Sequence, residues 1–278
     1  MHTILCPVDF TENTRNMLQY VLKMNAHLKA RIILLHVYET PVLYTTAKFA
    51  MNQDLALFKE AKENLEDLRD TALKDSGSTQ ADTELIVEQG LPSEKIIEIA
   101  LARNVNLLVM AASSLSKVER LVVGSNASRV INNAPCRIMI IPPSAAFTGL
   151  KKIVFATDLL ADNLAAGKAL EKFCKKFNAI ITRVHVSGST PEQASPDKPA
   201  VIRTKRSRAE KEGIHSVVAD SVAQGIGKFM NGRDMNCLAV FHRPRNVFGN
   251  LANASLSKRL SFYCQTPVLI LHANDRHL

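Results

Sequence analysis

A chain of 278 residues, with 46% hydrophobic and 22% charged residues, has the length and composition of a soluble globular protein with one large domain or two of ordinary size. The sequence contains no run of about 18 apolar residues, which argues against a membrane span. Met1 leads directly into an apolar run, so the sequence predicts no signal peptide and a cytoplasmic location.

The net charge of +9 is concentrated in the second half of the chain. Residues 1–145 carry 15 Lys and Arg against 16 Asp and Glu, whereas residues 146–278 carry 20 against 10. Part of the excess lies in the run RTKRSRAEK at 203–211. One interpretation is a phosphate-rich partner. We favour a solvated basic loop, because no aromatic residues are interleaved with these charges to stack on bases.

In chain order, the first half contains five short, continuous apolar runs, which are typical of parallel strands covered on both faces. The runs are ILCPV (4–8), IILLHV (32–37), ELIV (84–87), NLLVM (106–110) and RIMII (137–141). Between them the apolar spacing becomes helical, as in the series Phe58, Ala61, Leu65, Leu68 and Ala72. This alternation predicts an α/β domain with an open, doubly wound parallel sheet.

The second half repeats the first. Asp9 and Asp158 end two similar apolar runs, and the spacing between them is the same as that between Val37 and Val186, which end the next pair of runs. Such a constant spacing predicts a duplicated domain.

The later segments of the two halves also match, at a shorter spacing. RNVNLLVMAA at 103–112 corresponds to RDMNCLAVFH at 233–242, and the final strands, 134–141 and 266–271, correspond when their prolines are aligned. The change of spacing predicts that the second copy lost about 19 residues between its second and third strands. The segment 142–149 is the predicted linker, and the polar segment 187–212 is predicted to be a mobile loop.

Short motifs follow the predicted strands in a fixed order. Pro-Val-Asp precedes a Thr-Glu-x-Thr helix start, and Leu-His-Val, Gly-x-Pro, Gly-Ser and Ala-Pro-Cys come later. They stand at 7–9, 11–14, 35–37, 90–92, 124–125 and 134–136. In this order, and with the repeat, the sequence resembles the universal stress protein family over nearly all of both halves.

The resemblance implies the fold of each half and the arrangement of the two. Each half is expected to be a Rossmann-like, adenine-nucleotide alpha hydrolase-like domain, the first at 1–143 and the second at 150–278. The two are expected to form an internal pseudo-dimer through their final strands, 134–141 and 266–271. A further homo-oligomer is left open.

In nucleotide-binding members of this family, the ends of the first two strands hold adenine and ribose. A loop of the form Gly-x-x-Gly, nine residues, Gly-Ser wraps the phosphates, since glycines let backbone N–H groups approach closely and the next helix presents its N-terminus. By this resemblance the nucleotide-binding residues are Pro7, Val8, Asp9, Val37, Met110, Ala111, Ser114, Gly124, Ser125 and Asn126.

Two of the three glycine positions depart from the family pattern, because they are Ala111 and Ser114. Strain at such a site and a lost bond to phosphate together cost roughly 2.5–5 kcal/mol, enough to turn a micromolar site into a millimolar one. In the second half the three positions are Phe241, Pro244 and Ala254. We therefore expect ATP, if it is bound, to be held by the first domain and not by the second.

Several residues also have a purely structural interpretation. Asp9 is either a ribose ligand or the N-cap of a helix beginning at Thr11, and the two roles are compatible. Asp158 is expected to be only a cap. His36 and His185, which end equivalent strands, are expected to be packed and hydrogen-bonded.

The five cysteines are scattered, with no two at metal-ligand or redox spacing. Cys6, Cys136 and Cys237 lie in strand-like runs and are expected to behave as small buried hydrophobes. The eight histidines form no metal-binding motif, so the sequence predicts no metal site.

The sequence contains no P-loop motif, no second carboxylate pattern for Mg²⁺ and no nucleophile elbow. The leading hypothesis is a non-catalytic stress-response binding and signalling module, with an adenine nucleotide and unidentified proteins as partners. Two alternatives stay open. One is an ATP-using α/β enzyme, and the other is a binder of nucleic acid or anionic surfaces through the basic second half, where Arg243 and Arg245 are the best anion candidates.

Overall fold

The structure, a computed structural model, describes residues 2–39, 47–77, 81–112, 125–187, 213–242, 266–273 and 275–276. These residues form two compact units. Unit 1 contains the described residues up to Phe147, together with Asp275 and Arg276, and unit 2 runs from Thr148 to Ala273.

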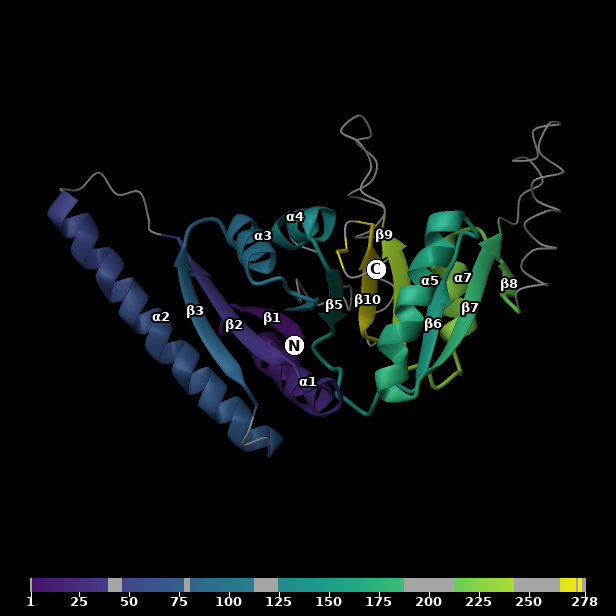
Figure 1. Cartoon of the computed structure of the whole chain (residues 1–278), viewed down its shortest axis with the longest axis horizontal. Coiled ribbons are helices and arrows are strands. Elements are labelled where there is room, and N and C mark those ends of the chain that lie inside the picture. The colour runs from purple at the N-terminus through teal and green to yellow at the C-terminus, as the bar shows by residue number, and fades with distance from the viewer. Residues whose placement is uncertain are drawn as a thin grey trace. The chain divides into compact units, whose positions relative to one another are not determined.

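Unit 1 is built on a five-stranded sheet in the order β3-β2-β1-β4-β5, and all of its strand pairs are parallel. The strands are β1 (Thr3–Val8), β2 (Arg31–Tyr38), β3 (Thr83–Gln89), β4 (Leu107–Ala111) and β5 (Arg137–Ile141). The helices are α1 (Glu12–Leu28), α2 (Ala47–Ser76), α3 (Pro92–Ala102) and α4 (Ser125–Asn133). Helix α1 contacts α2, and α3 contacts α4, so the helices form two pairs against the sheet (Figure 1).

Unit 2 has the same topology, with strand order β8-β7-β6-β9-β10 and parallel pairing throughout. Its strands are β6 (Lys152–Ala156), β7 (Ile180–Ser187), β8 (His215–Val218), β9 (Cys237–His242) and β10 (Val268–His272). Its described helices are α5 (Ala161–Cys174), the short 3₁₀ helix η1 (Lys175–Phe177) and α7 (Val222–Met230). The predicted fold, two tandem open doubly wound parallel sheets, is confirmed.

Strand register shows that the first and fourth strands of the two units align residue by residue. In unit 1 Ile4 is level with Leu107, and in unit 2 Ile153 is level with Cys237. The sequence repeat matches Ile4 with Ile153 and Leu107 with Cys237, so the register preserves the alignment of the first and fourth strands.

The predicted alignment of the final strands, which matches Ile138 with Ile270, is wrong by two positions. Leu108 pairs with Ile138 in unit 1, and its counterpart Leu238 pairs with Val268 in unit 2, so Ile138 corresponds to Val268. Continuous apolar runs fit one another at several registers, so the sequence alignment depended on the Pro before each final strand. Aligning these two prolines gave the wrong register. The segment between the fourth and fifth strands therefore has the same length in both units.

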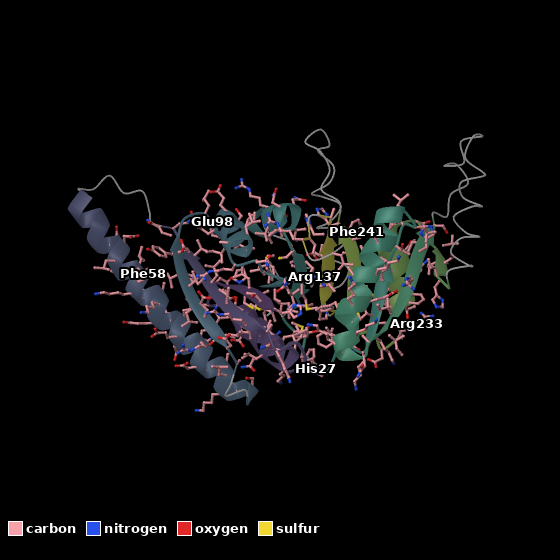
Figure 2. The ribbon with its side chains drawn as sticks, in the orientation of Figure 1. His27, Phe58, Glu98, Arg137, Arg233 and Phe241 are labelled. Atoms are coloured by element: carbon pink, nitrogen blue, oxygen red, sulfur yellow. The ribbon has the colours of Figure 1, made fainter. Side chains whose placement is uncertain are left out.

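Most of the predicted apolar face of helix α2 is confirmed. Ala61, Leu65, Leu68 and Ala72 are buried, but Phe58 is 39% exposed. A 30-residue helix is about 45 Å long, whereas the 8-residue strand β2 spans about 26 Å. The first turns of α2 therefore extend beyond the strands it packs on, and Phe58 lies in that early part of the helix (Figure 2).

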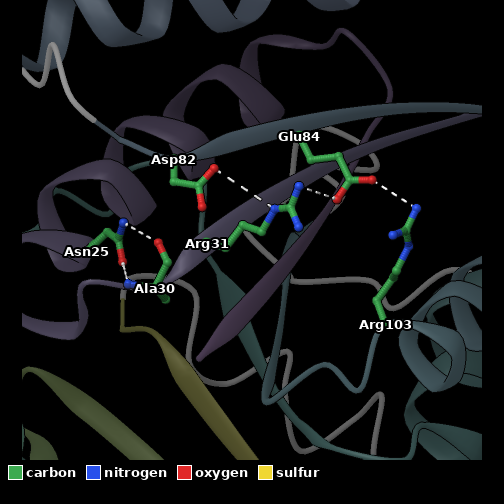
Figure 3. Close-up of polar contacts among 6 residues, drawn as sticks. All are labelled: Asn25, Ala30, Arg31, Asp82, Glu84 and Arg103. Carbon is green, nitrogen blue, oxygen red and sulfur yellow. Dashed lines mark hydrogen bonds and ion pairs between the residues drawn. The ribbon is translucent and has the colours of Figure 1, made fainter. Parts of the chain in front are cut away.

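A polar network fixes the edge of unit 1 at which β2 and β3 begin (Figure 3). The Asn25 amide donates to the Ala30 carbonyl and accepts from the Ala30 N–H, both at 2.9 Å, across the turn from α1 to β2. Glu84 binds the guanidinium of Arg31 at 3.2 Å and that of Arg103 at 2.9 Å. Two strands and the end of α3 are thus tied together at the edge opposite the strand C-termini.

The expected linker is largely attached to unit 1. The Asn16 side chain donates to the carbonyls of Pro142 and Ala145, at 3.2 and 3.1 Å. The Phe147 ring lies edge-on to Tyr20 with centroids 5.1 Å apart. Within this segment, the boundary between the units falls after Phe147. The expected loop at 187–212 lies outside the described residues except for Ser187, which is the last residue of β7.

The four cysteines in the described ranges are buried and form no disulfide with one another. Burial raises the pKa of Cys136 and of Cys237 to about 12, so both thiols remain protonated at neutral pH. The predicted role of Cys6, Cys136 and Cys237 as small hydrophobes is confirmed. In the part of the chain that the structure describes, no helix has the length and apolar character needed to cross a membrane.

Two glycines of α7 provide a matched test of packing in unit 2. A Cβ on Gly225 would lie 2.5 Å from Val186 Cγ1, whereas a Cβ on Gly227 would meet nothing within 4 Å. We expect Gly225→Ala to destabilise the protein by about 1–3 kcal/mol through overpacking. Gly227→Ala should stabilise it by about 0.4–1 kcal/mol, because it only restricts the unfolded chain. Urea unfolding followed by circular dichroism measures both, and equal effects of the two substitutions would contradict this packing.

Candidate functional site

The strand order of unit 1 defines where a ligand can approach the sheet. The chain proceeds from β1 outward through β2 and β3, then returns to place β4 on the other side of β1. In open α/β sheets, ligands bind beyond the carboxyl ends of the strands at this switch point. In unit 1 that position lies beyond Val8 of β1 and Ala111 of β4.

Asp9 is the first residue after β1 and is exposed at this position. Its Oδ1 accepts hydrogen bonds from the Thr11 N–H at 3.2 Å, the Thr11 hydroxyl at 2.7 Å and the Thr14 hydroxyl. Thr14 is almost fully buried, so the carboxylate is fixed to the framework of α1. Within the described ranges, no residue donates a hydrogen bond to the second carboxylate oxygen, Oδ2.

The environment of Asp9 favours its ionised form. Partial burial alone would raise its pKa, but the hydrogen bonds from Thr11 and Thr14 outweigh burial and lower the pKa below its usual value. Asp9 is therefore a fixed carboxylate at neutral pH. One of its oxygens is held by the protein, and the other can accept a hydrogen bond from a ligand hydroxyl.

The turn after Asp9 contains an unusual backbone conformation. Phe10 has a φ of 61°, in the left-handed region that bulky residues rarely adopt. Its ring lies against that of His36, tilted by 35° with centroids 4.4 Å apart, and the His36 ring Nδ1 lies 2.9 Å from the Val8 carbonyl. Such strain of about 1–2 kcal/mol is typical of functional sites. Here it turns the chain sharply from β1 toward α1.

Most of the predicted site residues come together at this edge of the sheet. Pro7 and Val8 end β1, Val37 lies near the end of the adjacent strand β2, and Met110 and Ala111 end β4. The Asn13 amide donates to the Ala112 carbonyl at 3.2 Å and thereby joins the start of α1 to the end of β4.

The remaining predicted residues belong to the phosphate end of the site. Ser125 and Asn126 are the first two residues of α4, and Asn126 is exposed. The first turn of α4 contains no acidic residue, so no carboxylate of that turn competes with a bound anion for the N-terminal N–H groups. Ser114, Gly124 and the side chain of Ser125 lie outside the described residues.

The predicted cap role of Asp9 and Asp158 is wrong in its details. The N-cap of α1 is Thr11, whose side chain accepts from the Thr14 N–H, and the helix begins at Glu12. The N-cap of α5 is Leu160, which makes no side-chain cap bond. Each aspartate lies two residues earlier and accepts the N–H of the cap residue instead, in an Asx-type turn.

Unit 2 preserves the framework of this edge. Leu159 has a φ of 66°, as Phe10 has 61° in unit 1. The His185 ring Nδ1 lies 2.9 Å from the Thr157 carbonyl, which matches the His36 contact. The predicted packed and hydrogen-bonded state of His36 and His185 is confirmed.

The end of the fourth strand nevertheless differs between the two units. Phe241 occupies in β9 the position that Ala111 occupies in β4, because both strands keep the same register with their neighbours. A half-buried phenyl ring therefore stands where unit 1 has a methyl group (Figure 2). The further candidates of this half, Arg243, Pro244, Arg245, Ala254 and Ser255, lie outside the described residues.

Sequence reasoning missed part of the site. Thr11 and Thr14 were visible in the helix-start motif, but their role in holding Asp9 was not predicted. The positive φ of Phe10 had no sequence signal, since the turn contains no glycine. The proximity of His242 and His272 was also missed, because it depends on the register of β9 and β10.

The strand order and the parallel pairing define unit 1 as a Rossmann-like α/β domain, the fold type of the adenine-nucleotide alpha hydrolases. The family model of the universal stress proteins matches residues 1–142 of this chain. The chain belongs to the universal stress protein family, as its motifs predicted.

Comparison with known proteins agrees with this assignment. A universal stress protein of Thermus aquaticus is 30% identical over 112 residues, which are 40% of this chain and 77% of that protein. One from Methanocaldococcus jannaschii is 24% identical over 140 residues, 50% of this chain and 80% of that protein. The crystal structure of a universal stress protein from Archaeoglobus fulgidus has a TM-score of 0.68 at 18% identity, covering 97% of this chain and 96% of that one. This last likeness concerns the fold alone.

Proposed function

We propose that this universal stress protein binds an adenine nucleotide, of which ATP is the leading candidate, in unit 1, and that unit 2 is retained as a folded domain without a nucleotide. It acts as a non-catalytic stress-response module in the cytoplasm, where its bound state is read by protein partners. The observation that carries the proposal is the fixed Asp9 carboxylate at the switch point of the sheet.

Asp9 suits the ribose of a nucleotide. The hydroxyls of Thr11 and Thr14 donate to its Oδ1 and so fix the orientation of the carboxylate. The position of Oδ2 is therefore set by the protein. A charged acceptor with a fixed orientation bonds a sugar hydroxyl without losing side-chain entropy on binding. The half-buried Val37, at the end of the neighbouring strand, provides apolar surface for a base on the same side of the switch point.

We assign the phosphates of the nucleotide to the start of α4 (Ser125–Asn133), because the first backbone N–H groups of a helix have no partner within the helix and favour anions. Ala111 is half-buried at the end of β4 and adds only a methyl group to the site. An alanine is the smallest side chain that can replace a family glycine, so it narrows the approach of a phosphate less than any other residue would.

Unit 2 is proposed not to bind a nucleotide because Phe241 occupies the position of Ala111. The phenyl ring takes up space that a nucleotide would need beyond the strand end. The non-catalytic assignment rests on the missing hydrolase motifs, and turnover of ATP by the purified chain at a rate abolished by a single substitution would overturn it.

The equivalent aspartates of the two units allow a matched test of nucleotide binding. Asp9→Asn keeps the acceptor for Thr11 and Thr14 but removes the charge, so it should weaken MgATP binding by about 10- to 100-fold. Asp158→Asn makes the same change in unit 2 and should leave the affinity unchanged. Calorimetric titration of both variants measures these effects. If Asp158→Asn weakened binding and Asp9→Asn did not, the nucleotide would belong to unit 2.

A further inference from the structure

Two histidines lie side by side at the strand ends of unit 2. His242 is the last residue of β9 and His272 the last residue of β10, and the parallel register of these strands places them level with each other. Their ring centroids are 5.2 Å apart, with 46° between the ring planes. The fixed register holds both imidazoles on adjacent strands of one sheet.

His272 is enclosed by protein, whereas His242 is half-buried. His272 is 0% exposed, and the Nε2 atom of His242 is buried as well. Among the described residues, no group forms a hydrogen bond with His242 Nε2. A buried nitrogen without a partner costs about 1–3 kcal/mol, so a ligand for this atom would recover that free energy.

Neutral imidazole has a lone pair on one ring nitrogen, and this is the form that coordinates metal ions.

We propose that His242 and His272 form a two-histidine site for a divalent transition metal ion, with Zn²⁺ as the physiological ligand and Co²⁺ or Ni²⁺ as analogues. Two imidazoles that share a tetrahedral Zn²⁺, at Zn–N distances of about 2.0–2.1 Å, have ring centroids about 5 Å apart. The observed separation of 5.2 Å fits this requirement. Imidazole ligands select zinc, copper and nickel over Mg²⁺ and Ca²⁺, which require oxygen.

The site differs from a closed structural zinc centre. Within the described ranges, no three His, Cys, Asp or Glu side chains are grouped so as to hold a metal ion. Two protein ligands leave coordination positions for water or for a small anionic ligand, as in zinc sites that exchange their outer ligands. Both ligands belong to unit 2, so the site uses no residue of the proposed nucleotide site in unit 1.

Zinc titration of the full chain tests this proposal. After removal of metal with a chelator, calorimetry with ZnCl₂ should show one site per chain in the wild-type protein. His242→Gln should weaken this site by at least about tenfold, since it removes one of two ligands. His215→Gln is the matched control, because His215 is an exposed histidine of the same unit and should leave zinc affinity unchanged.

A second readout separates metal binding from a general loss of structure. Co²⁺ bound by imidazole gives visible absorption bands, which should appear with the wild-type protein and with His215→Gln but not with His242→Gln or His272→Gln. Zn²⁺ should also raise the thermal midpoint of the wild-type protein and not that of a folded His242→Gln variant. Absence of zinc binding by the wild-type chain, or equal zinc affinity of wild-type and His242→Gln proteins, would overturn the proposal.

Discussion

Asp275→Ala is expected to lower the free energy of unfolding of unit 1 by about 3–5 kcal/mol. The Asp275 carboxylate is 0% exposed and lies 3.1 Å from Nε of Arg137, whose side chain is only 10% exposed. Removing Asp275 takes away an ion-pair partner of the largely buried Arg137 guanidinium. The Arg276 N–H, which donates to the Pro135 carbonyl at 3.1 Å, is expected to lose protection as well.

Hydrogen exchange of peptides from β5 measures this effect directly, because it reports the opening free energy of unit 1 itself. The double variant Arg137→Met, Asp275→Leu is the control. It removes both charges and should recover most of the lost stability, since apolar replacements of a buried ion pair are often neutral or better. A loss of less than about 1 kcal/mol in Asp275→Ala would show that the pair contributes little to unit 1.

Phe155→Ala is expected to destabilise unit 2 by about 3–5 kcal/mol. Phe155 is fully buried in β6 and is among the largest side chains of the core. A Cβ on Gly167 of α5 would lie 3.2 Å from the Phe155 ring, so the ring packs directly on the helix backbone. Truncation therefore leaves a cavity between β6 and α5 that neither element can close without shifting.

Two further substitutions separate cavity formation from the simple loss of apolar surface. Phe155→Leu keeps most of the volume and should cost much less than Phe155→Ala. Phe58→Ala removes the same atoms from a residue that is 39% exposed and should also have a smaller effect. Hydrogen exchange of β6 peptides distinguishes the two Phe155 variants. Urea unfolding measures the effect of Phe58→Ala. Equal losses of unfolding free energy in Phe155→Ala and Phe58→Ala would contradict the assigned burial.

The strands and the duplication were predictable because each depends on a local pattern. The continuous apolar runs of β1, β2 and β4 are largely buried, and this pattern requires no tertiary knowledge. The alignment of the final strands could not be found in the same way. Their apolar runs fit at several registers, and only the pairing of Leu238 with Val268 determines the alignment.

The site was predictable only in part. Asp9 follows a strand and precedes a helix, so its place at the sheet edge follows from chain order. The positive φ of Phe10 and the capture of Oδ1 by Thr14 depend on the three-dimensional path of the turn. His242 and His272 lie far apart in the sequence, and only the register of their strands brings them together.

Unit 2 shows how a duplicated domain can keep its fold while its ligand edge changes. The backbone features next to the site persist, as Leu159 and His185 demonstrate. The end of β9 has instead acquired Phe241 in place of the small residue of unit 1. The predicted pseudo-dimer through strands at 134–141 and 266–271 remains a prediction.

The number of MgATP molecules bound per chain is the quantity on which the proposed function depends most directly. Calorimetric titration of the purified full chain measures both this number and the affinity. One site per chain, occupied below millimolar MgATP, is predicted, since Asp9 is fixed in unit 1 and Phe241 occupies the position of Ala111 in unit 2. Two sites per chain, or no binding up to millimolar MgATP, would contradict the assignment of unit 1 as the single nucleotide-binding domain.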